Sequence, residues 1–211
     1  MLPAQILPLP PRFRIDYRGL RRSARAGSIH ELIADLRLRF PAQWQRVYTA
    51  AASHTPNIIH VEYGTFDSIC DSDSGMEALG EVAFDQRVRD RVVGVLGISF
   101  PLRGRQRGSL PKDWVEHPGE VDGSGRDKGH FIAHAIGGGL DINVFSQAGG
   151  LNRGISEQGK VYRLMERYCY DNAGTFCFSR PVYDDATSIR RWVEFGLLRD
   201  DGNLWIELFE N

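Results

Sequence analysis

The sequence is poor in cysteine. Its three cysteines, Cys70, Cys169 and Cys177, leave at least one thiol over in any scheme of intramolecular disulfides, so the dense disulfide framework of small secreted proteins is excluded. Pairing of Cys169 with Cys177 across the turn at 172–174 is one alternative. Free buried thiols are the other, and we favour them because cysteine packs well as a small apolar residue.

Long hydrophobic runs and an excess of charge are also missing. No apolar run approaches the roughly 20 residues that a membrane-spanning helix needs, and the prolines near the N-terminus do not form a signal-peptide pattern. We therefore expect a soluble protein, either cytoplasmic or exported by a route other than general secretion. The formal net charge of -1 gives no bulk attraction to polyanions, so any nucleic-acid contact must come from a local basic patch.

The chain is long enough to bury a large core, with 211 residues of which 42% are hydrophobic. We divide it into a basic, Pro- and Arg-rich N-terminal arm at 1–27, a helical and strand region at 28–119, and a catalytic core at 120–211. The arm carries six arginines against the single acid Asp16. Such a stretch is typical of a solvated arm, and phosphate binding is the alternative.

The spacing of apolar residues indicates an α+β fold. Ser28 is a suitable N-cap for a helix that we expect to end or kink at Pro41, followed by a second helix at 43–52. The remaining predicted elements are strands at 57–66 and 92–100, helices at 76–93 and 160–170, an acidic loop at 67–75, a basic loop at 101–111, and a hairpin that joins 189–198 to 204–206.

Residues 127–166 concentrate the groups that carry chemistry. Phosphodiester hydrolysis needs an activated water, neutralisation of the phosphate charge and help for the departing oxygen, and a neutral histidine with one hard cation can supply all three. His130, beside Gly129 at the end of a predicted strand, is the candidate base. Asn152 offers an uncharged oxygen that leaves Mg²⁺ with several of its waters, as that ion prefers.

A second histidine, His134, lies four residues after His130. On a helix this spacing is that of a zinc pair, but the glutamate of the zinc-protease motif is missing and three glycines follow at 137–139. We therefore interpret His134 as structural or substrate-facing.

The order of these residues resembles the DNA/RNA non-specific endonuclease family of the ββα-metal, or His-Me finger, superfamily. That family carries an Asp-Arg-Gly-His motif at a strand end, then Asn-x3-Gln-x4-Asn, then a helix with a glutamate. The matching residues are Asp127, Lys128, Gly129, His130, Asn143, Gln147, Asn152 and Glu166. The resemblance covers about residues 120–211. It implies an α+β fold in which a small antiparallel sheet supports a ββα-metal core, with additional N-terminal helices.

The resemblance also implies roles. His130 is the general base, Asn152 the direct metal ligand and Glu166 the holder of metal-bound water. Asn143 belongs to the catalytic group, where it shapes the loop with Gln147 and orients the His130 ring. The segment 155–161 is longer than in secreted members of the family, so the match of Glu166 depends on a loop between Asn152 and the helix.

The predicted substrate contacts are Lys128, Arg153 and Arg163. Lys128 stands where the family has arginine, which keeps the positive charge and loses the bidentate fork for phosphate.

The implied function is Mg²⁺-dependent endonucleolytic cleavage of DNA and RNA with little sequence preference, with Mn²⁺ as a substitute ion. The implied setting is a bacterial toxin or effector nuclease with an inhibitory immunity protein as partner. The alternative is a non-catalytic nucleic-acid- or protein-binding module that keeps the fold. The near-neutral charge favours that alternative, and the intact base and ligand oppose it.

Overall fold

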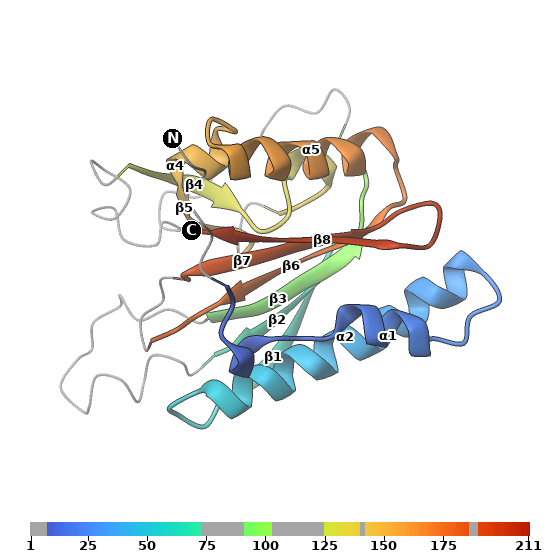
Figure 1. Cartoon of the computed structure of the whole chain (residues 1–211), viewed down its shortest axis with the longest axis horizontal. Helices are drawn as coiled ribbons and strands as arrows, with labels where there is room; N and C mark the ends of the chain where they lie inside the picture. Colours follow the sequence, from blue (N-terminus) through green and yellow to red (C-terminus); the bar gives the residue numbers. More distant parts are fainter. Residues whose placement is uncertain (1–7, 73–90, 103–124, 140–141, 186–189) are drawn as a thin grey trace.

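The chain forms an α+β structure around a six-stranded antiparallel sheet (Figure 1). The computed structural model describes residues 8–72, 91–102, 125–139, 142–185 and 190–211. The strand order is β1-β2-β3-β6-β7-β8, and every neighbouring pair is antiparallel. The strands are β1 (Ile58–Tyr63), β2 (Phe66–Asp71), β3 (Arg91–Ile98), β6 (Phe176–Val182), β7 (Trp192–Leu198) and β8 (Leu204–Glu210).

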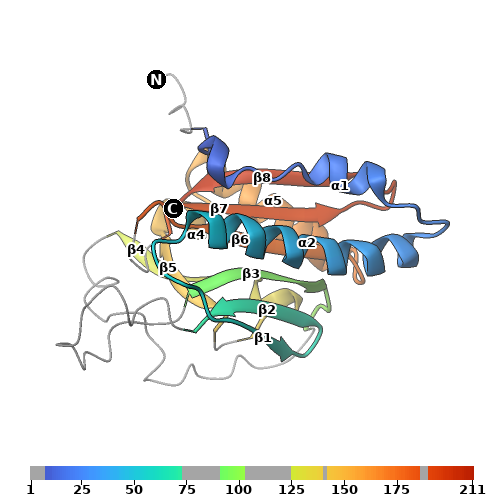
Figure 2. The same ribbon diagram turned by 90° about the horizontal axis from the view of Figure 1, so that it is seen from below.

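Helices cover one face of this sheet, and a hairpin with two helices covers the other. The first face carries α1 (Tyr17–Ser23) and α2 (Ile29–Ala51), which runs along the sheet (Figure 2). The opposite face carries β4 (Arg126–His130), β5 (Val144–Ala148), α4 (Gly149–Asn152) and α5 (Glu157–Asp171). Short 3-10 turns lie at η1 (Pro11–Phe13) and η3 (His134–Ile136). The predicted α+β class is confirmed, although the sheet is larger than expected.

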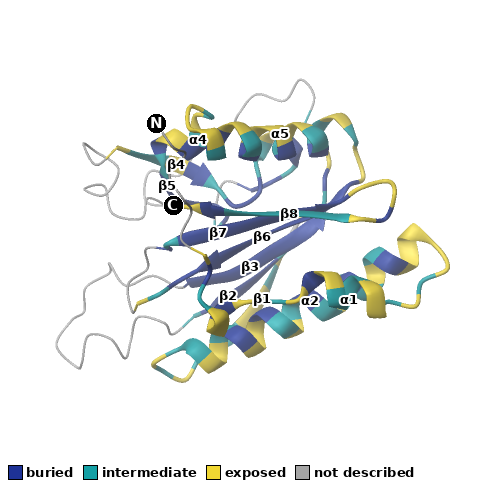
Figure 3. Cartoon of the chain, viewed as in Figure 1, coloured by how far each residue is buried: buried dark blue, intermediate teal, exposed yellow. Residues whose placement is uncertain are grey.

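Because both faces are covered, the central strands are buried along their whole length (Figure 3). Phe176 and Phe178 of β6 pack toward Phe40 of α2, whereas Cys177 between them packs in the core beneath α5. This is the alternation expected of a strand. All three cysteines are buried and free, which decides between the two alternatives left by the sequence.

A β-bulge in β3 makes room for the largest side chain of the α2 face. Ile69 pairs with Gly94 and Cys70 pairs with Val92, so one residue of β3 is extra. The ring of Trp44 lies over Gly94, where an added Cβ would stand 2.3 Å from a ring carbon. Glycine is therefore required beneath Trp44.

The first helix does not end at Pro41, so that part of the prediction is wrong. One helix, α2, runs from Ile29 to Ala51 with Pro41 inside it. The Ser28 side chain caps it by accepting a hydrogen bond from the Glu31 N–H. A proline inside a helix costs ~3 kcal/mol, but the apolar stripe continues past it in phase. Burial of the aromatic side chains on that stripe, worth about 2 kcal/mol or more for each, offsets the cost.

The expected strand at 57–66 is a hairpin of two strands. β1 and β2 are joined at Gly64, whose φ of 62° suits a tight turn. The predicted acidic loop at 67–75 is therefore wrong over Asp67–Asp71, which belong to β2 and are largely buried. The strand at 92–100 corresponds to β3, and the hairpin near the C-terminus to β7 and β8. Most of the helix predicted at 76–93 and of the basic loop at 101–111 lies outside the described residues.

The described part of the basic N-terminal segment, residues 8–27, packs on the sheet through its apolar side chains, which corrects the expectation of a solvated arm there. Leu9, Phe13 and Tyr17 are buried at a spacing of four residues. The Tyr17 hydroxyl donates to Glu194 at 2.7 Å, and Arg180 donates to the same carboxylate at 2.6 Å. The prediction was made from the six arginines of the segment and did not take account of these three apolar residues. In the described part of the chain, no helix has the length and apolarity to cross a membrane.

Candidate active site

The β4–β5 hairpin forms a two-stranded sheet of its own and presents His130 at its end. Phe131 and Phe145 stack with ring centres 4.3 Å apart and anchor the hairpin in the core. Gly129 allows the Gln147 side chain to cross the hairpin, because an added Cβ would stand 2.2 Å from its amide oxygen. The Asn211 side chain ties β5 to the main sheet, accepting from Ala148 N–H at 3.0 Å.

Asn143 is a structural clamp for the loop that follows His130. Its amide oxygen accepts from Ile132 N–H at 2.8 Å, and its amide nitrogen donates to the carbonyls of Ile132 at 2.7 Å and Gly139 at 2.9 Å. The side chain is buried and does not line the pocket described below. These contacts agree with the prediction that Asn143 shapes the loop, and its part in catalysis stays a prediction.

Asn152 is oriented by Asp127. The Asn152 Nδ2 donates to Asp127 Oδ2 at 3.2 Å, and Arg153 Nε donates to the same oxygen at 2.8 Å. The Arg153 hydrogen bond holds the pKa of Asp127 below its ordinary value, assisted by Asn152 against the opposing effect of burial. Because its nitrogen is engaged, Asn152 turns its amide oxygen away from Asp127. Arg153 pairs with Asp127 and does not line the pocket, and its predicted contact with substrate stays a prediction.

One face of helix α5 packs in the core, and another face lines the pocket described below. Tyr162, Met165 and Cys169 are buried, and the Tyr162 hydroxyl donates to the carbonyl oxygen of His130 at 3.1 Å. Ser156 caps the helix by accepting from Gly159 N–H at 3.0 Å. The pocket face carries residues at the helical spacing of three and four: Arg163, Glu166, Arg167 and Tyr170.

A close contact between α4 and α5 fixes the two helices relative to each other. An added Cβ on Gly159 would stand 2.4 Å from the carbonyl oxygen of Gly150, so only glycine permits this approach. The connection at 153–156 turns at Gly154, where φ is 69°. This is the loop on which the match of Glu166 depends.

One pocket of about 600 Å³ brings most of the predicted site residues together. Of those predicted as catalytic, metal-binding or substrate-binding, it is lined by Lys128, His130, Asn152, Arg163 and Glu166. It also contains His134, Arg167 and Tyr170. Sequence reasoning missed Arg167 and Tyr170, although their spacing of four and seven residues from Arg163 would have placed them on the same helix face.

No family model matches the chain. No curated protein sequence matches it either. Among solved structures, NucA from Streptococcus agalactiae with magnesium ion bound aligns at a TM-score of 0.45 and 15% identity, covering 80% of this chain and 90% of that one. The same protein with no metal bound aligns at a TM-score of 0.42 and 15% identity, covering 80% and 88%. The case for a function therefore rests on the pocket itself.

The pocket offers oxygen donors for a cation. In the described ranges, no three His, Cys, Asp or Glu side chains come together as they would in a protein-rich metal site. The amide oxygen of Asn152 and the carboxylate of Glu166 are hard donors of the kind that Mg²⁺ and Mn²⁺ prefer, and Mg²⁺ normally keeps several waters. The residues present therefore fit an ion held by few protein groups and much water.

The surroundings of Glu166 disfavour the ionised form of its carboxyl group. Burial raises its pKa to about 7, against the lowering effect of Arg163, whose Nη1 lies 3.4 Å from Glu166 Oε2. The side chain is only 15% exposed. A cation bound nearby would favour the ionised form.

This burial predicts a pH dependence of stability without metal. The folded state keeps a proton on Glu166 between its ordinary pKa of 4.5 and about 7, whereas the unfolded state has lost it, so the free energy of unfolding falls as pH rises through that window. We expect Glu166→Gln to remove this fall and to stabilise the metal-free protein at pH 8 by about 2 kcal/mol.

Urea unfolding with chelator at pH 5 and pH 8 measures the pH dependence of the free energy of unfolding. Glu157→Gln, on the exposed first turn of α5, is the control. An equal pH dependence in parent and Glu166→Gln would contradict the prediction.

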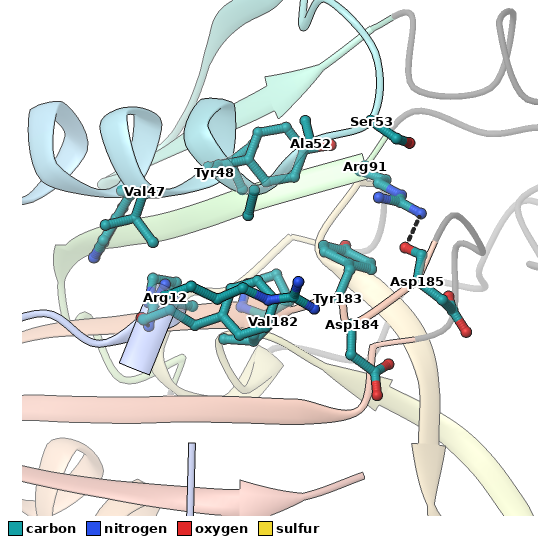
Figure 4. Close-up of a pocket in the computed structure, with 16 residues that line it drawn as sticks. Arg12, Val47, Tyr48, Ala52, Ser53, Arg91, Val182, Tyr183, Asp184 and Asp185 are labelled. Carbon is teal, nitrogen blue, oxygen red and sulfur yellow. Dashed lines mark hydrogen bonds between the residues drawn. The ribbon is translucent and has the colours of Figure 1, made fainter. Parts of the chain in front are cut away.

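A second, smaller pocket of about 280 Å³ lies between the end of α2, η1 and the end of β6 (Figure 4). Arg91 Nη2 donates to the carbonyl oxygen of Asp185 at 2.9 Å, and its guanidinium lies 4.6 Å from the centre of the Tyr183 ring. Arg12 also lines this pocket, beside Phe13. None of the residues predicted to act in catalysis, metal binding or substrate binding lines it.

Proposed function

We propose that the chain is a Mg²⁺-dependent non-specific endonuclease that hydrolyses phosphodiester bonds of DNA and, by the same chemistry, of RNA. Its catalytic unit would be a ββα-metal core made of β4, β5 and α5. The observation that supports this most is that His130, Asn152 and Glu166, far apart in the sequence, line one pocket. A bacterial toxin or effector with an immunity protein as inhibitor is the setting that the sequence resemblance implies.

The pocket residues would have different roles in hydrolysis. His130 takes a proton from the attacking water, and Lys128 and Arg163 hold the phosphate. Asn152 would hold the magnesium ion through its amide oxygen, and Glu166 would hold it through a bound water. When bound, the ion supplies positive charge to the phosphate oxygens and to the departing oxygen.

The local charge of the pocket suits a polyanion even though the whole chain is near neutral. Among the described residues of the lining, Lys128, Arg163 and Arg167 carry positive charge and Glu166 is the one carboxyl group. Arg167 also pairs with Asp171. Cations confined to a concave site attract an anionic substrate locally.

The direct test is cleavage of plasmid DNA and of a structured RNA by the full chain in Mg²⁺, in Mn²⁺ and in excess chelator. Cleavage that needs the divalent ion supports the proposal. Binding of either nucleic acid without cleavage under any of these ions would favour the non-catalytic module.

The salt dependence of binding distinguishes the pocket from the basic N-terminal segment. Helix α1 and helix α5, which lines the pocket, lie on opposite faces of the sheet (Figure 1). We therefore expect Arg18→Gln and Arg22→Gln to leave the slope of log affinity against log salt unchanged. Lys128→Gln should lower it by about one unit, the loss of one phosphate contact. Fluorescence titrations at several salt concentrations measure both. A lower salt slope in the α1 variants would show that the basic N-terminal segment binds phosphate.

A further inference from the structure

The pocket has an aromatic end that hydrolysis itself does not use. Tyr170 lines it one helical turn beyond Glu166 on α5. Part of the Tyr170 side chain packs against the main core, so the ring is held in place. Four residues of helix span about 6 Å along its axis, which suits the step from a phosphate to the base of an adjacent nucleotide.

Two further side chains line the same pocket: Arg167, beside the Tyr170 ring, and His134 on η3, which packs against α5. The guanidinium of Arg167 lies 5.6 Å from the centre of the Tyr170 ring, and Arg167 Nε donates to Asp171 at 2.7 Å. His134 Nδ1 lies 3.1 Å from the carbonyl oxygen of Gly138. Because a carbonyl can only accept, Nδ1 carries the proton, and in the neutral ring Nε2 is an acceptor.

We infer that this end of the pocket, built from Tyr170, Arg167 and His134, receives the base of a nucleotide next to the scissile phosphate and makes the enzyme prefer single strands. The inference rests on the proposed function. An aromatic ring and a guanidinium plane are the surfaces on which unpaired bases stack, and the His134 Nε2 can accept from an amino group on the base edge. A base in a duplex is already stacked and paired, and freeing it costs a few kcal/mol. The aromatic end therefore stabilises a bound single strand and does not stabilise a bound duplex in the same way.

The test uses the full chain and three substrates of equal length: a single-stranded oligonucleotide, its duplex, and a strand of abasic sugar phosphates. Tyr170→Leu removes the ring and keeps an apolar side chain, and Tyr170→Phe keeps the ring. We expect Tyr170→Leu to raise KM for the single strand by about 5- to 100-fold, the range of one lost stacking contact, with kcat little changed. Tyr170→Phe should behave like the parent. Cleavage of the duplex and of the abasic strand should be the same in all three proteins.

The abasic strand also serves as the control for folding, because it reports the hydrolytic site without the base. Unchanged KM for the single strand in Tyr170→Leu, or an equal loss on the abasic strand, would overturn the inference. If Tyr170→Leu fails to fold, Arg167→Lys replaces it, because it keeps the positive charge of the pocket and removes the guanidinium plane; it must raise KM selectively for the single strand. Failure of the parent protein to cleave any substrate would instead overturn the proposed function.

Discussion

Replacement of His130 by alanine is expected to lower kcat for plasmid cleavage by about 100-fold or more, the scale of a lost general base. Affinity for nucleic acid should change little, because in the proposed site Lys128 and Arg163 would hold the phosphate. The fold should persist as well, since the neighbouring Phe131 supplies the buried contacts of this strand end.

The measurement combines single-turnover cleavage with a binding titration in Ca²⁺, and His60→Ala is its matched control. His60 is an exposed histidine of β1 and lies in another sheet. A general base also shapes the pH profile, so the alkaline plateau of kcat should disappear in His130→Ala. Near-parental cleavage by this variant would remove His130 from the mechanism.

Asn152→Ala is expected to abolish divalent-dependent cleavage at every Mg²⁺ concentration. If Asn152 is the one direct protein ligand, its loss leaves the ion held by water and substrate alone. Glu166→Ala should cost less, about 10- to 100-fold, because it would act through a bound water. Activity of the parent should vanish with chelator and return with Mg²⁺ or Mn²⁺.

Titration of Mg²⁺ into each variant, with plasmid and RNA cleavage as the readout, measures these losses. Arg153→Gln is the neighbouring control, since it removes a partner of Asp127 and leaves the Asn152 amide in place. Cleavage that resists chelator, or an Asn152→Ala variant as active as the parent, would show the metal assignment to be incorrect.

Local patterns in the sequence predicted the elements on which the pocket is built. A helix was predicted at 160–170, and α5 runs from Glu157 to Asp171. The Asp- and Gly-rich turn at 200–203 predicted the β7–β8 hairpin. The motif order from 127 to 166 named four of the residues that line the pocket, and the predicted substrate contacts added a fifth, Arg163.

Features set by distant contacts were not predictable in the same way. Pro41 stays inside α2 because Phe40 and Trp44 are buried against strands that lie far along the chain. The Asp127 carboxylate engages Arg153 across 26 positions, and nothing in an Asn-Arg-Gly sequence shows that this arginine is already paired. Local propensity is a weak guide where tertiary packing decides.

The β4–β5 hairpin has its own ladder of hydrogen bonds, separate from that of the six-stranded sheet. Among the described residues, the stacked pair Phe131 and Phe145 and the Asn211 side chain help to join it to the rest of the molecule. Cooperative units of this kind can open without global unfolding. The strand that bears His130 can therefore exchange its amide hydrogens, and lose its alignment with α5, at a lower free energy than the sheet beneath it. Hydrolytic competence would then be lost on heating before the molecule melts.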